Sequence, residues 1–146
     1  MKVAEILVSY YPTTPPKDRT LVKSSQTVYD MIHKIWNMDQ IDYREEFMVL
    51  YLDRKNGIIG HYLHSTGSDV ATIVSVKQII AIALKVNACA LILMHNHPSG
   101  QLCPSENDRA LTKRVKEAAK MFDISLLDHL IVTSDGYFSF ADDGMM

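Results

Sequence analysis

Hydrophobic residues recur at two different spacings along this chain of 146 residues. Over residues 28–36 and 76–84 they fall three and four positions apart, the spacing of an amphipathic helix with one buried face. A third helix is predicted from the Pro104-Ser105 pair to about Met121, with an inner stripe of Leu111, Val115, Ala118 and Phe122. The expected N-caps are Ser24 or Ser25, Ser75 and Ser105.

Short apolar and β-branched runs between these segments predict strands. They lie at residues 3–11, 45–52, 58–64, 88–94, 126–133 and 137–140. Asn56-Gly57 and Asp135-Gly136 are hairpin turn signals, and the fully apolar run that ends at Met94 is typical of a central strand. Strands interspersed with helices predict an α/β protein with a mixed sheet.

The first residues differ from the rest of the chain. We expect residues 1–22 to form an amino-terminal strand followed by a Pro-rich arm, because Pro12, Pro15 and Pro16 enforce an extended connection. The remaining residues, 23–146, form a single domain. An exposed amino-terminal strand could pair with a second copy, so a homodimer is one expected assembly.

The composition and charge of the chain limit the classes of function that we expect. Hydrophobic residues make up 47% and charged residues 22% of the chain, with a net charge of −2, which gives no general reason to expect nucleic acid as the main ligand. A basic row occurs in the third helix and is interpreted as a solvated face; it consists of Arg109, Lys113, Lys116 and Lys120. Cys89 and Cys103 form no CxxC pair, and no apolar run approaches membrane-spanning length, so we expect a cytoplasmic protein with no membrane contact.

Candidate chemistry is concentrated between residues 95 and 108. In an extended chain, side chains two positions apart point to the same side, so His95 and His97 can direct their imidazoles at one point. Asp108 is the best third ligand because it shares the helix face of Leu111 and Val115. Two histidines and one carboxylate leave a tetrahedral position open for water, as in catalytic zinc sites.

Each of these residues also has a structural interpretation. Ser105 followed three residues later by Asp108 approximates a capping box, which is compatible with a ligand role for Asp108. Cys103 is interpreted as a passive loop thiol rather than a further ligand. His129 is either a partner of a metal ligand or a satisfied strand histidine, and the residues alone leave both interpretations open.

The spacing His95-x-His97, seven residues, Ser105, two residues, Asp108 resembles the JAMM (MPN+) metalloprotease motif. The surrounding residues, in 90–105 and 127–132, are similar to the RadC branch of that family. This resemblance implies a three-layer sandwich of the cytidine deaminase-like type, with a mixed sheet flanked by helices. It covers the chain from about Arg44 to the carboxyl end.

The resemblance also implies roles. His95, His97 and Asp108 would bind Zn²⁺, and Ser105 would help to stabilise a tetrahedral intermediate. A glutamate at the start of the upstream hairpin would be the general acid and base. Composition does not separate Glu45 from its neighbour Glu46, whereas the RadC pattern Arg-Glu-x-Phe selects Glu45 and leaves the neighbour to the solvent.

These observations support two hypotheses. The first is a zinc-dependent hydrolase that cleaves a peptide or isopeptide bond of an unknown protein substrate with a metal-activated water. The second is a non-catalytic or weakly catalytic interaction module in DNA repair or mobile-element biology. RadC relatives carry a DNA-repair label, but their longer members have an amino-terminal helix-hairpin-helix-like region that this chain is too short to contain. Nucleic-acid contact therefore has weak support.

Overall fold

The computed structural model of the protein describes residues 1–67 and 73–146. The helices are α1 (Ser25–Ile35), α3 (Val76–Lys85) and α4 (Glu106–Lys120), with short 3-10 turns at Pro16–Asp18 and Met38–Gln40. The strands are β1 (Glu45–Leu52), β2 (Ile58–Gly67), β3 (Ala90–Asn96), β4 (Ser125–Thr133) and β5 (Gly136–Ser139). Within the described residues, no helix is long and apolar enough to cross a membrane.

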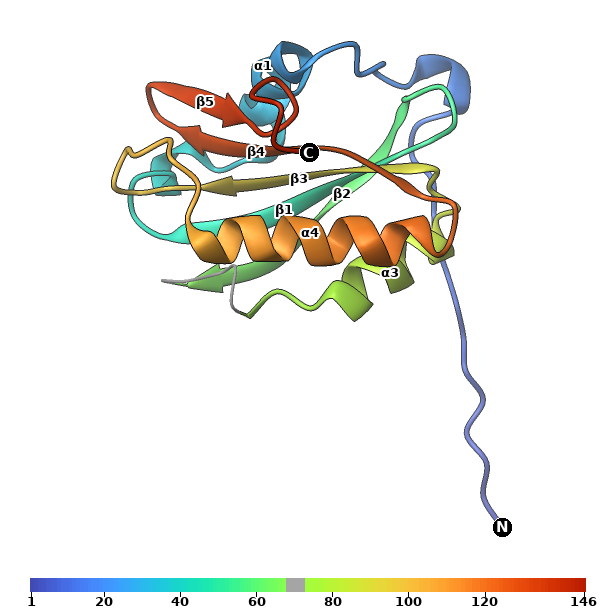
Figure 1. Ribbon diagram of the computed structural model, residues 1–146. Helices are drawn as coiled ribbons and strands as arrows, with labels where there is room; N and C mark the ends of the chain where they lie inside the picture. Colours follow the sequence, from blue (N-terminus) through green and yellow to red (C-terminus); the bar gives the residue numbers. More distant parts are fainter. Residues whose placement is uncertain (68–72) are drawn as a thin grey trace.

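The five strands form one mixed sheet in the order β2-β1-β3-β4-β5. Strand β3 lies at its centre, antiparallel to β1 and parallel to β4, while the two outer pairs are antiparallel. Helices α3 and α4 cover one face of the sheet and α1 covers the other (Figure 1). The predicted α/β fold with a mixed sheet and three layers is confirmed.

Alternation along the central strands divides the core in two. Leu91 and Leu93 of β3 pack with Phe47 of β1 against α3 and α4. Ile92 and Met94 pack against α1 on the opposite face. Because consecutive side chains of a strand point to opposite faces, every residue of β1 and β3 is assigned to one of these two layers.

The local predictions hold wherever a cap or a turn residue specifies the boundary. Ser24, Ser75 and Ser105 each accept a backbone N–H of the first helical turn, so they are the N-caps of α1, α3 and α4. The hairpin between β1 and β2 turns at Asn56, whose φ of 61° is the left-handed conformation expected at this position.

Two predictions of local structure are wrong. Residues 3–11 form neither helix nor strand, and their chain extends away from the sheet (Figure 1). No described strand runs beside them, and a strand needs a partner for its backbone N–H and C=O groups. Phe122 is 49% exposed, because α4 ends at Lys120 and Ala119 completes its buried face instead. Pairing of residues 3–11 with a second copy stays a prediction.

Candidate metal centre

The candidate ligands His95 and His97 lie at the carboxyl end of β3. His95 is the last residue of that strand on the α4 face, continuing the row of Leu91 and Leu93, and is 1% exposed. His97 follows in the loop, with its Nε2 atom 2.9 Å from Nε2 of His95. The alternation predicted from the sequence thus directs both rings to one point.

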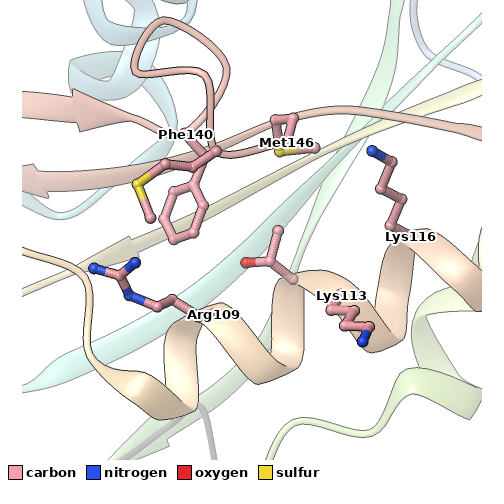
Figure 2. Close-up of a pocket in the computed structure, with 7 residues that line it drawn as sticks. Arg109, Lys113, Lys116, Phe140 and Met146 are labelled. Atoms are coloured by element: carbon pink, nitrogen blue, oxygen red, sulfur yellow. The ribbon is translucent and has the colours of Figure 1, made fainter.

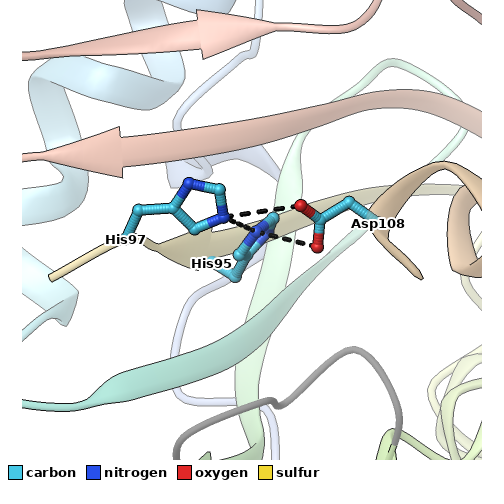
Figure 3. A group of neighbouring side chains, drawn as sticks. All are labelled: His95, His97 and Asp108. Atoms are coloured by element: carbon cyan, nitrogen blue, oxygen red, sulfur yellow. Dashed lines mark hydrogen bonds and ion pairs between the residues drawn. The ribbon is translucent and has the colours of Figure 1, made fainter. Parts of the chain in front are cut away.

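Helix α4 supplies the carboxylate. Its N-terminus is fixed by a capping box in which Ser105 Oγ accepts the Asp108 N–H at 3.1 Å and Asp108 Oδ2 accepts the Ser105 N–H at 2.7 Å. The same carboxylate lies 3.2 Å from His95 Nε2 and 3.4 Å from His97 Nε2 (Figure 3). Capping and approach to the histidines are therefore compatible, as predicted.

The three side chains have the spacing of a metal site. Ligands bound about 2.0–2.1 Å from a tetrahedral zinc ion lie roughly 3.3 Å apart, close to the observed separations. Two imidazoles and a carboxylate also form the donor set of catalytic zinc sites. The residues therefore fit a metal ion with one coordination position left open.

The charges of the cluster are also suited to binding a metal ion. Burial alone would raise the pKa of the Asp108 carboxyl, but hydrogen bonds with His95 and His97 hold it well below its usual value. The hydrogen bond with Asp108 raises the pKa of His97, against the opposing effect of burial. A buried ionised carboxylate facing two imidazoles is an arrangement that a dication would stabilise.

Hydrogen bonds behind the cluster fix the histidine tautomers. The Gln101 carbonyl can only accept, so His97 Nδ1 donates to it at 2.7 Å, and Nε2 is the nitrogen that would give up its proton to bind a metal. Thr112 Oγ1 donates to the Asp108 carbonyl at 2.7 Å and accepts from His129 Nδ1 at 2.6 Å. His129 Nε2 then accepts from His95 Nδ1 at 2.8 Å, so Nε2 is likewise the nitrogen of His95 that would bind a metal.

His129 is suited to this intermediate position. It is fully buried, and burial lowers its pKa well below the usual value, so the ring is neutral and has one donor and one acceptor nitrogen. Phe140 stacks on it with ring centroids 4.8 Å apart. Of the two interpretations of His129, contact with a candidate metal ligand is the one that the geometry shows.

The two candidate glutamates face opposite sides of the sheet. Glu45 lines an open pocket of about 400 Å³ together with His97, Ser105 and Asp108. Glu46 is on the α1 side, where it is 5% exposed and pairs with Arg44 at 3.2 Å. The expectation that Glu46 is solvated is wrong, because the guanidinium compensates its buried charge.

Two further side chains of the loop lie at this pocket. The hydroxyl of Ser105 accepts the cap hydrogen bond and still has its own proton to donate. Cys103 is an exposed free thiol that lines the pocket, and the metal-ligand cluster found among the described residues does not include it. This is consistent with the interpretation of Cys103 as a loop thiol.

Two residues of the site were not predicted from the sequence. Thr112 lies one helical turn after Asp108 and is buried, a position that its spacing alone could have indicated. Asn96 lies between the two histidines and is fully buried on the opposite face, where any amide needs hydrogen-bond partners.

The basic row of α4 lies beside a second hollow. Arg109, Lys113 and Lys116 line an open pocket of about 470 Å³ with Phe140 and Met146 (Figure 2). The cationic side chains are exposed, as predicted, but they border an apolar floor rather than a flat solvated face.

Comparison with known proteins is consistent with this geometry. The model of the RadC-like JAB domain matches residues 22–145. A UPF0758 protein of Flavobacterium johnsoniae is 45% identical over 101 residues, which cover 69% of this chain and 44% of the relative. The UPF0758 proteins YkfG and YeeS of Escherichia coli are 45% and 44% identical, over 70% and 77% of this chain and 65% and 75% of their own lengths.

The match spans the whole sheet, all three named helices and every residue of the candidate metal cluster. The chain covers less than two thirds of the first two of these relatives. With the family model matched over most of its length, this chain belongs to the RadC-like JAB domain family.

Proposed function

We propose that this protein is a zinc-dependent hydrolase that cleaves a peptide or isopeptide bond with a metal-activated water. The observation that carries the proposal is the convergence of two imidazoles and a carboxylate on one point, beside a pocket that Glu45 also lines. Membership of the RadC-like JAB domain family supports the assignment to the hydrolases. Two imidazoles and one carboxylate are donors that suit zinc.

A zinc ion held by His95, His97 and Asp108 would lower the pKa of a water molecule and polarise a substrate carbonyl. The Glu45 carboxylate would take the proton of the attacking water and return it to the leaving amine. The free O–H of Ser105 would donate to the oxyanion that develops on the carbonyl. Thr112 and His129 would keep the Nε2 atom of His95 unprotonated throughout.

The test uses the zinc-loaded protein and a panel of fluorogenic peptide amides with a lysine-isopeptide reporter. Glu45→Gln keeps the side-chain shape but removes the base, so cleavage should fall by about 10² to 10⁴-fold. Zinc content should not change. The matched control is Glu46→Gln, which alters the α1 face and should retain cleavage. Equal activity of wild-type protein and Glu45→Gln would contradict the proposal.

A second candidate function, an interaction module, is favoured by the basic pocket of α4. Its three cations would attract an anionic partner, a nucleic acid or an acidic protein segment. In that case Glu45→Gln would keep full biological function, whereas Lys113→Glu with Lys116→Glu would abolish it. We further propose a cytoplasmic setting, in which the free thiols of Cys89 and Cys103 would remain reduced.

A further inference from the structure

Asn96 occupies a special position in β3. It is the residue between the two candidate ligands, and strand alternation turns its side chain to the face opposite theirs. There it is 0% exposed and contacts Ile41, a residue of the core layer that packs against α1. A buried amide has to satisfy both its oxygen and its nitrogen within the protein.

The partners of Asn96 all belong to the segment that carries Glu45. Its Nδ2 donates to the Ile41 carbonyl at 2.6 Å and to the Arg44 carbonyl at 2.8 Å. Its Oδ1 accepts the Glu46 N–H at 2.7 Å. One side chain therefore spans at least 50 residues of sequence with three short hydrogen bonds.

Two of these bonds hold the peptide groups on either side of Glu45. The Arg44 carbonyl belongs to the peptide bond before Glu45, and the Glu46 N–H belongs to the peptide bond after it. Backbone pairing of β1 with β3 is found only from Phe47 opposite His95 onwards. At Glu45 the Asn96 amide thus takes the place of backbone pairing between β1 and β3. The backbone of Glu45 is thereby fixed to β3, the strand that carries His95.

We propose that Asn96 is the positioning residue that fixes the Glu45 carboxylate relative to His95 and His97. The inference rests on the proposed function for the role of Glu45. The three hydrogen bonds of Asn96 to the backbone of residues 41–46, which we call the clamp, do not depend on that function. Because the clamp and both histidines belong to three consecutive residues, a shift of β3 carries ligands and base together. Residues 95–97 would then set the distance between the Glu45 carboxylate and a metal held by the two histidines.

The first test measures cleavage by zinc-loaded Asn96→Asp. Aspartate is nearly isosteric and keeps an acceptor for the Glu46 N–H, but it cannot donate to the two carbonyls. We expect kcat to fall about 10- to 100-fold, because a misplacement of about 1 Å has effects of this size. KM and zinc affinity should stay within about twofold, since neither ligand is changed. Asn56→Gly is the control, because it removes an asparagine at the distant hairpin and keeps the positive φ.

A double-mutant cycle separates positioning from general damage. If Asn96 acts through Glu45, Asn96→Asp should cause no further loss of cleavage in the Glu45→Gln background. An additional loss as large as in the wild-type background would overturn the proposal. So would a wild-type kcat in Asn96→Asp.

The clamp is also testable without any substrate. In the wild-type protein, nuclear magnetic resonance should show slowly exchanging Asn96 side-chain amide protons and a protected Glu46 backbone N–H. Asn96→Asp should increase exchange of residues 41–46 more than tenfold, with α4 unchanged. If these protons exchange rapidly in the wild-type protein, the clamp is absent. If they are protected but no protein form cleaves the panel, the proposed hydrolase fails while the clamp stands.

Discussion

Thr112→Val removes one buried hydroxyl and keeps the shape of the side chain. That hydroxyl donates to the Asp108 carbonyl and accepts from His129 Nδ1. Without it, the His129 Nδ1–H is either buried with no acceptor or lost through a change of tautomer. In the second case His129 Nε2–H donates to His95, and the proton of His95 moves to Nε2, where it blocks the metal.

The magnitude follows from these two alternatives. An unsatisfied buried donor costs about 1–3 kcal/mol, which should appear as a lower free energy of unfolding. Loss of the residue that orients a metal-ligating histidine typically lowers metal affinity about 10- to 100-fold. Thr112→Ser keeps the hydroxyl and loses only a methyl group, so it should bind zinc nearly as well as the wild-type protein.

The assay is a competition titration of zinc against a chelator at fixed pH, with urea unfolding of the same three proteins. The expected order of zinc affinity is wild type, then Thr112→Ser close behind, then Thr112→Val. If Thr112→Val and Thr112→Ser bind zinc with equal affinity, the hydrogen-bond chain through His129 does not set the tautomer of His95.

Three further predictions concern stability. The Nε2 atom of His64 lies 2.8 Å from the Tyr51 hydroxyl, and burial lowers the pKa of this histidine to about 4. Below pH 6.5 the unfolded chain therefore binds more protons than the folded protein. The free energy of unfolding should therefore fall by about 1–2 kcal/mol between pH 6.5 and pH 4, allowing for partial exposure, and the fall should be smaller in His64→Gln by urea titration. Zinc at about 100 times its dissociation constant should stabilise the fold by about 2.7 kcal/mol, an effect that a chelator reverses and that His95→Ala abolishes in thermal scans. Ser105→Ala should cost about 1 kcal/mol through loss of the α4 cap, whereas Ser105→Asp, another good cap, should retain most of the stability in urea unfolding.

Local signals were sufficient to predict most of the fold. The caps at Ser24, Ser75 and Ser105, and the Asn56-Gly57 turn, each specify backbone conformation through contacts of a few residues. The strand predicted at residues 3–11 failed because strand formation depends on a neighbouring strand, which composition does not reveal.

The parts of the candidate site that follow strand or helix periodicity could be predicted from the sequence. Alternation brings His95 and His97 together, and the helical spacing to Leu111 and Val115 directs Asp108 inwards. The orientation of Glu45 depends on where β1 begins and which face its side chain takes. A single-residue shift would have exchanged it with the neighbouring glutamate.

The long-range hydrogen bonds were beyond sequence reasoning. Asn96 contacts a segment about 50 residues away, and His129 of β4 contacts both His95 of β3 and Thr112 of α4. No local pattern marks such partners. A buried polar residue beside a candidate ligand is nevertheless a signal that partners must exist.

The central claim is that His95, His97 and Asp108 hold a catalytic metal. The most direct measurement is metal content and X-ray absorption of the protein purified without chelators. We expect about one zinc ion per chain, bound by two imidazole nitrogens and oxygen ligands at about 2.0–2.1 Å, and loss of that zinc in His95→Ala. Zinc below about 0.2 per chain after zinc loading, unchanged by His95→Ala, would contradict it.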